Sequence, residues 1–130
     1  MLITNNIQWF IGVFRVEECS VLVAEDDDDL RELYEHWFDE MDGFAGEFVE
    51  NGEKAQSYME DVDIAILDID MPKKTGYEVV EDYGKDDTLI MMVTGRAADE
   101  KLVDLPVNDY LNKPVNKDDI YDSLEKMTPF

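Results

Sequence analysis

The sequence predicts an α/β fold, a doubly wound five-stranded parallel sheet covered by helices on both faces. Short continuous apolar runs alternate five times with helix-like segments between residues 20 and 128. Such runs are typical of strands buried on both faces, and their alternation with helices indicates a parallel sheet. The chain of 130 residues is long enough to bury one core.

The first strand is predicted over residues 21–24, and an amphipathic helix follows it. The apolar positions of this helix recur at helical spacing and are Leu30, Leu33, Tyr34, Trp37, Phe38 and Met41. Asp27, Asp28 and Asp29 precede them, where carboxylates cap free N–H groups and face the positive end of the helix dipole. His36 lies off the apolar stripe, so we expect it on the surface.

The later elements continue the alternation. Strands are predicted over 44–49, 64–67, 89–93 and 109–111, and helices over 53–60, 76–83, 97–103 and 120–127. The second strand should end at Asn51-Gly52, a turn-forming pair. The closing helix carries an apolar face formed by Ile120, Tyr121, Leu124 and Met127.

Residues 1–18 lie outside this alternation as an N-terminal extension, which leaves residues 19–130 as the domain. The apolar stretch from Ile7 to Phe14 is too short to span a bilayer, which takes about 20 residues. The first basic residue is Arg15, so a signal peptide is not indicated. We expect either an irregular segment packed on the domain or an arm that docks a partner or a second copy.

The charge excludes several classes of function. Lys and Arg total 11 and Asp and Glu total 33, which gives a net charge of −22. Phosphate backbones and anionic membranes would be repelled, so we expect no nucleic-acid and no membrane partner. We expect a cytoplasmic protein of a salt-loving microbe, because salt screens the self-repulsion. With Cys19 as the single cysteine, an intramolecular disulfide is excluded, as is a zinc site built from Cys or His.

Chemically useful side chains follow four of the predicted strands. The first strand ends in Glu25-Asp26, the third in Asp68, the fourth in Thr94 and the fifth in Lys113. Ligands of open parallel sheets bind at the carboxyl ends of the strands. The sequence therefore predicts that these residues meet in one site.

The charges at this edge predict a divalent cation. Glu25, Asp26 and Asp68 would carry −3 and Lys113 +1, which leaves −2. Clustered carboxylates raise one another's pKa, and a divalent cation would neutralise the excess. Mg²⁺ (or Mn²⁺) suits oxygen ligands in an open cage, and a carboxylate beside the metal can attack a phosphoryl group.

Four segments occur in an ordered combination. They are Val21-Leu22-Val23-Ala24-Glu25-Asp26, Leu67-Asp68-Ile69-Asp70-Met71-Pro72 followed by Gly76, Val93-Thr94-Gly95, and Asp109-Tyr110-Leu111-Asn112-Lys113-Pro114. With them, residues 20–128 resemble the receiver domain of two-component response regulators, with Glu25 where Asp is more usual. The resemblance implies the flavodoxin-like (βα)5 receiver fold and a phosphorylation switch. Such a domain is no general enzyme, because it catalyses only its own phosphoryl transfer and dephosphorylation.

The resemblance implies a phosphoacceptor and its metal ligands. Asp68 would accept a phosphoryl group from a sensor histidine kinase or a phosphotransfer protein. Asp26, Asp68 and the backbone carbonyl of Asp70 would bind Mg²⁺ directly. Glu25 would bind it directly or through water.

The resemblance also implies the path of the signal. Lys113, joined to Pro114 by a cis peptide bond, would pair with the phosphoryl oxygens. Thr94 would turn inward to the phosphoryl group, and Tyr110 would follow from exposed to buried. The output face would then bind a downstream effector protein or form a homodimer.

Two spacings depart from the family pattern, and a pair of charged residues suggests a further role. Asp68 to Thr94 is 94 − 68 = 26 residues and Thr94 to Lys113 is 113 − 94 = 19, both shorter than the family's spacings. The third and fourth helices should therefore each lose about one turn, which weakens the case for the usual dimer and partner groove. Asp70 and Arg96 border the path of attacking water in this family, and we hypothesise that they gate dephosphorylation.

Other functions stay open on the sequence alone. The domain could be a receiver-like interaction module that works without phosphorylation. Asp68-x-Asp70 also resembles the nucleophile motif of haloacid-dehalogenase-like phosphatases, although Pro72 does not fit it and the acidic pair precedes the nucleophile. The chain ends soon after the last helix, so we expect a stand-alone receiver or part of a longer regulator.

Overall fold

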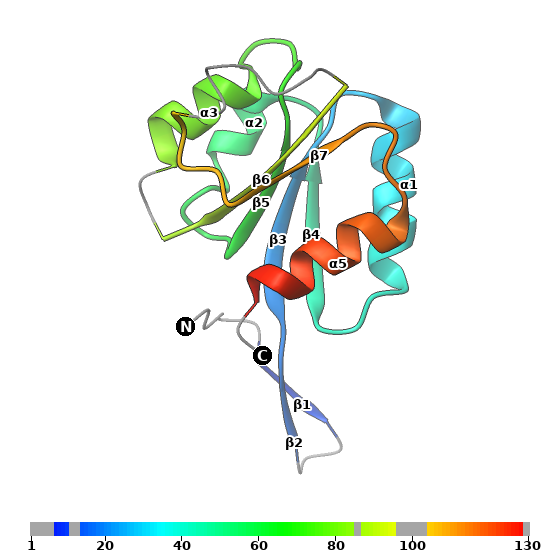
Figure 1. Ribbon diagram of the computed structural model, residues 1–130. Helices are drawn as coiled ribbons and strands as arrows, with labels where there is room; N and C mark the ends of the chain where they lie inside the picture. The colour runs from blue at the N-terminus through cyan, green and yellow to red at the C-terminus, as the bar shows by residue number, and fades with distance from the viewer. Residues whose placement is uncertain (1–6, 11–13, 85–86, 96–103, 129–130) are drawn as a thin grey trace.

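The computed structural model describes residues 7–10, 14–84, 87–95 and 104–128, and these form a layered α/β domain (Figure 1). A five-stranded sheet has the order β4-β3-β5-β6-β7, and every neighbouring pair in it is parallel. Its strands are β3 (Cys19–Ala24), β4 (Phe44–Val49), β5 (Ile64–Asp68), β6 (Leu89–Thr94) and β7 (Asp109–Asn112). The predicted fold class is confirmed.

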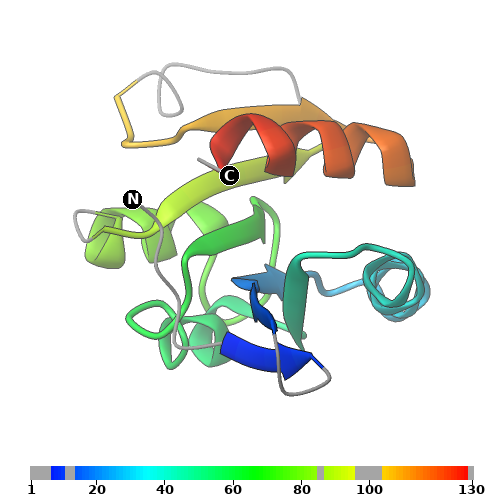
Figure 2. The same cartoon turned by 90° about the horizontal axis from the view of Figure 1, so that it is seen from below.

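Helices cover both faces of this sheet. They are α1 (Asp28–Asp39), α2 (Gly52–Gln56), α3 (Gly76–Tyr83) and α5 (Lys117–Met127). Figures 1 and 2 show α1 and α5 on one face and α2 and α3 on the other. The helix expected over 97–103 lies outside the described residues. Among the described residues, no helix is long and apolar enough to cross a membrane.

Alternation along the strands divides the core into two clusters. Val21, Ile66 and Met91 pack with Tyr34 of α1 on one face. Leu22, Leu67 and Met92 belong to the opposite cluster, which lies under α2 and α3. Successive side chains of a strand point to opposite faces, so each strand contributes to both clusters. Packing on both faces therefore fixes the position of each strand, and with it the position of the residues at the strand's carboxyl end.

Several predicted boundaries differ from the structure by one to four residues, and the starts of β3 and α5 and the end of α2 differ most. β3 begins at Cys19 because parallel pairing with β4 already starts at Cys19 opposite Phe44. The helix predicted over 53–60 ends at Gln56. Beyond it, the amide of Asp61 donates to the carbonyl of Tyr58, a three-residue hydrogen bond that is tighter than an α-helical one. The region after Gln56 therefore continues as turns.

The N-terminal extension contains a β-hairpin. β1 (Ile7–Phe10) pairs antiparallel with β2 (Phe14–Glu17) and stays outside the five-stranded sheet. In Figure 1 the hairpin continues below β3, away from the helices. The expectation of an irregular segment is wrong for these strands, because their backbone groups pair with each other. The alternative of a docking arm stays a prediction.

Candidate functional site

Three carboxylates meet at the carboxyl ends of β3 and β5. Oxygens of Glu25, Asp26 and Asp68 all lie within 4.8 Å of one another. Glu25 is 1% exposed and Asp68 6%, whereas Asp26 is open to solvent. The register explains the meeting, because Ala24 pairs with Leu67 and each strand then turns into the same edge.

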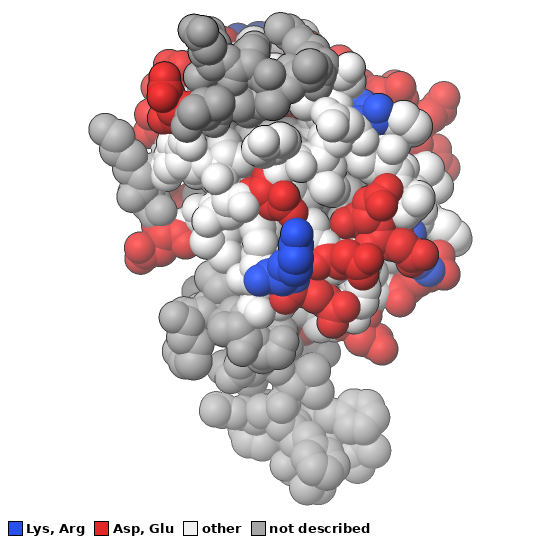
Figure 3. Space-filling model, in the orientation of Figure 1, with Lys and Arg blue, Asp and Glu red and all other residues white. Residues whose placement is uncertain are grey.

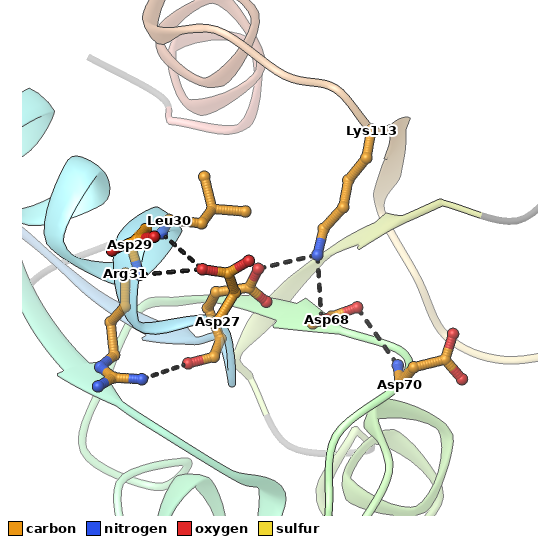
Figure 4. A network of polar contacts seen from close by, with 8 residues as sticks. Asp27, Asp29, Leu30, Arg31, Asp68, Asp70 and Lys113 are labelled. Carbon is orange, nitrogen blue, oxygen red and sulfur yellow. Dashed lines mark hydrogen bonds and ion pairs between the residues drawn. The ribbon is translucent and has the colours of Figure 1, made fainter.

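Lys113 reaches this cluster from the end of β7. Its Nζ lies 2.8 Å from Oε1 of Glu25 and 3.2 Å from Oδ2 of Asp68 (Figure 4). Its backbone N–H donates to the carbonyl of Thr94 at 2.7 Å, and the bond to Pro114 is cis, as the resemblance implied. The structure thus brings together four residues that the sequence places as far as 88 positions apart.

The cluster shifts the proton affinities of its members. Burial, followed by the neighbouring carboxylate of Asp68, raises the pKa of Glu25 to about 8. Burial and Asp68 also raise the pKa of Asp26. Burial by itself would lower the pKa of Lys113, but Glu25 and Asp68 outweigh it and raise that pKa. The expected mutual effect of clustered carboxylates is visible in Glu25 and Asp26.

The donor set fits a hard divalent cation. Within the described part of the chain, Oε2 of Glu25 is buried and has no hydrogen-bond partner. A buried carboxylate oxygen without a partner is costly, and a cation would satisfy it. Three carboxylates and one ammonium leave an excess of negative charge, and their oxygens are the ligands that Mg²⁺ prefers.

The loop after β5 is shaped around Asp68. The amide of Asp70 donates to Oδ1 of Asp68 at 3.3 Å, and the amide of Gly76 donates to the carbonyl of Ile69 at 2.9 Å. A Cβ on Gly76 would lie 2.4 Å from the carbonyl oxygen of Asp68, closer than any side chain can approach. Gly76 therefore allows α3 to begin directly against the end of β5.

The predicted switch residues lie on the neighbouring strands. Thr94 ends β6 and is 1% exposed, whereas Tyr110 on β7 is 51% exposed. Arg96, the other half of the hypothesised dephosphorylation gate with Asp70, lies outside the described residues. His36 is exposed beside Glu40, as expected.

Arg31 is a residue that the sequence reasoning missed. Its Nη1 donates to the backbone carbonyl of Glu25 at 2.9 Å, and its Nη2 lies 2.6 Å from Oδ1 of Asp28. A signal was present, because Arg31 is the only Lys or Arg between Arg15 and Lys54. A single cation after a run of four Asp residues merits attention.

Comparison with known proteins decides the family. Residues 21–125 match the response regulator receiver domain. The chain belongs to this family. It is therefore a receiver domain of two-component signalling, and the family assignment decides against the phosphatase alternative.

The curated relatives are longer than this chain. The chain is 34% identical over 116 residues to a putative transcriptional regulator of Haloferax volcanii, covering 87% of this chain and 20% of that protein. It is 33% identical over 102 residues to the transcriptional regulatory protein CpxR of Klebsiella pneumoniae, covering 75% and 44%. The chain thus spans less than half the length of these curated relatives.

Solved structures agree with the fold. A CheY-like receiver domain of Methanospirillum hungatei superposes with a TM-score of 0.77 at 23% identity, covering 85% of this chain and 93% of that one. A DNA-binding response regulator of the LuxR family from Staphylococcus aureus gives a TM-score of 0.77 at 27% identity, covering 83% and 97%. Both comparisons therefore agree with the receiver fold of this chain.

Proposed function

We propose that this receiver is a phosphorylation switch in which Asp68 accepts the phosphoryl group. The observation that carries the proposal is the cluster of Glu25, Asp26 and Asp68 with the Lys113 ammonium 3.2 Å from the acceptor carboxylate. Asp26, Asp68 and the carbonyl of Asp70 would hold Mg²⁺ (or Mn²⁺), with Glu25 binding directly or through water. The partly unsatisfied carboxylate of Glu25 supports a metal at this place.

The transfer needs little more than correct positions and charge. An oxygen of Asp68 attacks the phosphorus of a phosphohistidine, a P–O bond forms, and the P–N bond to the histidine breaks. Mg²⁺, when bound, neutralises phosphoryl oxygens during this exchange. Lys113 is already held at the acceptor and supplies the remaining positive charge.

The output follows from the strands beside the acceptor. Phosphorylation replaces the single charge of Asp68 by about −2 on the phosphoryl group. Thr94 would turn its hydroxyl to the new oxygens, and Tyr110, exposed on the adjacent strand, would move inward after it. The two conformations then present different surfaces, which is how a local charge change shifts a population.

Proteins fit this surface better than nucleic acid does. Asp118, Asp119, Asp122 and Glu125 are exposed along α5. Figure 3 shows acidic side chains gathered on this face with few Lys or Arg among them. We therefore propose a sensor histidine kinase or phosphotransfer protein as the donor, and an effector protein or a second copy as the output partner, in the cytoplasm.

A single experiment tests the switch. Wild type and Asp68→Asn are incubated with Mg²⁺ and either a small acyl phosphate or beryllofluoride, with Asp61→Asn, which changes an exposed acid elsewhere, as the control. We expect wild type and the control to gain one phosphoryl mass and a spectral change, and Asp68→Asn to gain neither. A silent wild type would favour the phosphorylation-independent interaction module, and a phosphorylated Asp68→Asn would move the acceptor elsewhere.

The dephosphorylation gate is tested on the same phosphorylated protein. Asp70→Ala and Arg96→Ala are each expected to change the lifetime of the phosphoryl group. Unchanged lifetimes in both variants would reject the gate and leave the acceptor assignment intact.

A further inference from the structure

The turn between β3 and α1 carries two of the proposed metal-binding carboxylates on a short piece of backbone. Glu25 leaves the sheet, Asp26 follows, and Asp27 already caps α1 by accepting from the amides of Asp29 and Leu30. The acids of this turn repel one another and Asp68, so something must hold the backbone in place before a metal arrives.

The backbone of Glu25 is held from two sides. Its N–H donates to the carbonyl of Val49 at 3.0 Å, which continues the pairing of β3 with β4. Its carbonyl accepts the 2.9 Å hydrogen bond from the Arg31 guanidinium, and the side chain of Arg31 is 21% exposed. The amide of Arg31 donates to the carbonyl of Asp27 in the first α-helical hydrogen bond of α1, so the helix fixes the backbone from which this side chain reaches back to the turn.

We propose that Arg31 is a positioning residue for the metal, because it fixes the Glu25–Asp26 turn in the geometry that binds the cation. This inference rests on the proposed function and names a residue outside the ligand set. A guanidinium suits the task, since its planar fork donates to the Glu25 carbonyl and to the Asp28 carboxylate at the same time. A lysine in its place has one ammonium and cannot reproduce that fork.

The chain offers a control of equal charge. Lys54 lines the same groove as Arg31 but pairs with Glu50 and does not contact the turn. Lys54→Met therefore removes one positive charge from the same region and leaves the Glu25 carbonyl untouched. The comparison separates the loss of a position from the loss of a charge.

The experiment titrates Mg²⁺ into the whole chain without any phosphodonor. Binding is followed by calorimetry, and unfolding in urea is measured with and without the metal. We expect Arg31→Met to weaken Mg²⁺ binding by about tenfold, as losses of groups that orient metal ligands do, and Arg31→Lys to recover only part of it. Lys54→Met should stay within about twofold of wild type, because a screened surface charge has little effect.

Each outcome decides between the claims. Equal Mg²⁺ affinity in Arg31→Met and Lys54→Met overturns the positioning role while the proposed metal site stands. A variant that loses stability without metal but keeps the wild-type Mg²⁺ affinity shows that Arg31 only supports the fold, and this also overturns the proposal. If wild type itself binds no Mg²⁺, the proposed function fails, and the positioning role fails with it.

Discussion

The parallel strands all begin at one side of the domain, the amino-terminal edge, and all end at the other, the carboxyl edge. Each edge carries a carboxylate close to a strand, but only the carboxylate at the amino-terminal edge has its hydrogen bonds satisfied. At the amino-terminal edge, Oδ2 of Asp63 accepts from both the amide and the hydroxyl of Ser20, at 3.0 and 3.1 Å. The amide of Asp63 donates back to that hydroxyl at 3.0 Å. At the carboxyl edge, Oε2 of Glu25 is buried and has no partner among the described residues.

The difference separates stability from function. The Asp63–Ser20 pair joins β5 to β3 with its polar groups satisfied, which contributes to the free energy of folding. The Glu25 cluster is costly without a ligand, because like charges share a partly buried space. A ligand that supplies positive charge offsets this unfavourable free energy, so we expect the carboxyl edge to bind a cation.

The largest expected effect is that Mg²⁺ stabilises the folded protein by binding at the carboxyl edge. At 100 times the dissociation constant, a single site adds about 2.7 kcal/mol to the free energy of unfolding. Urea unfolding of wild type with Mg²⁺ and with EDTA measures the gain, and Asp26→Asn should reduce it. An unfolding curve that does not respond to Mg²⁺ would contradict the metal site.

The next largest effect is expected when the Asp63–Ser20 pair at the amino-terminal edge is removed. Asp63→Ala leaves the Ser20 amide without its acceptor and should lower the free energy of unfolding by about 2 kcal/mol. Asp61→Ala removes the same charge from an exposed position two residues away and should change it by less than about 0.5 kcal/mol. Mg²⁺ affinity should be unchanged in both, and a weaker affinity in Asp63→Ala would mean that the two edges are coupled.

A pH series sharpens the contrast at Glu25. Its pKa rises from 4.5 to about 8 in the folded protein, so the folded state holds this proton more tightly than the unfolded state does. The stability of the metal-free protein should therefore fall as pH rises through this window, and no cost applies below it. Glu25→Gln removes this contribution, so its stability relative to wild type should increase as pH rises through this window, by up to about 1.4 kcal/mol for each pH unit. Parallel stability curves from urea unfolding in EDTA would reject this explanation.

The smallest expected effect concerns a second hydrogen bond at the amino-terminal edge. The hydroxyl of Thr88 donates to the carbonyl of Met59 at 2.7 Å. Thr88→Val keeps the shape and should cost about 1 kcal/mol in thermal or urea unfolding. The phosphorylation rate with a small acyl phosphate should remain at the wild-type value. A slower rate would mean that Thr88 contributes to the site at the carboxyl edge.

Much of this arrangement could be predicted because it depends on local patterns. The boundaries of β4 and α3 agree with the prediction, and Asp27 caps α1 as the acidic run indicated. The end of α2 could not be predicted, because five helical residues are followed by turns whose apolar residues still suit a helix. The hairpin before β3 was also missed, since a short apolar stretch without alternation does not distinguish a strand from an irregular segment.

The site shows the same division. Its acids and its lysine were found because each follows a predicted strand, and parallel strands bring those ends to one edge. Arg31 was missed because its partner is a backbone carbonyl six residues earlier, and no residue-type pattern identifies a carbonyl as an acceptor.

The sequence by itself determined the alternation of strands and helices along the chain and which chemical groups follow each strand, because periodicity and strand ends are local properties. Only the tertiary structure decided that Lys113 lies nearer to Glu25 than to Asp68, at 2.8 against 3.2 Å, and that one oxygen of Glu25 is left without a donor. Such distances depend on the packing of β3, β5 and β7 together, and no single segment contains that information.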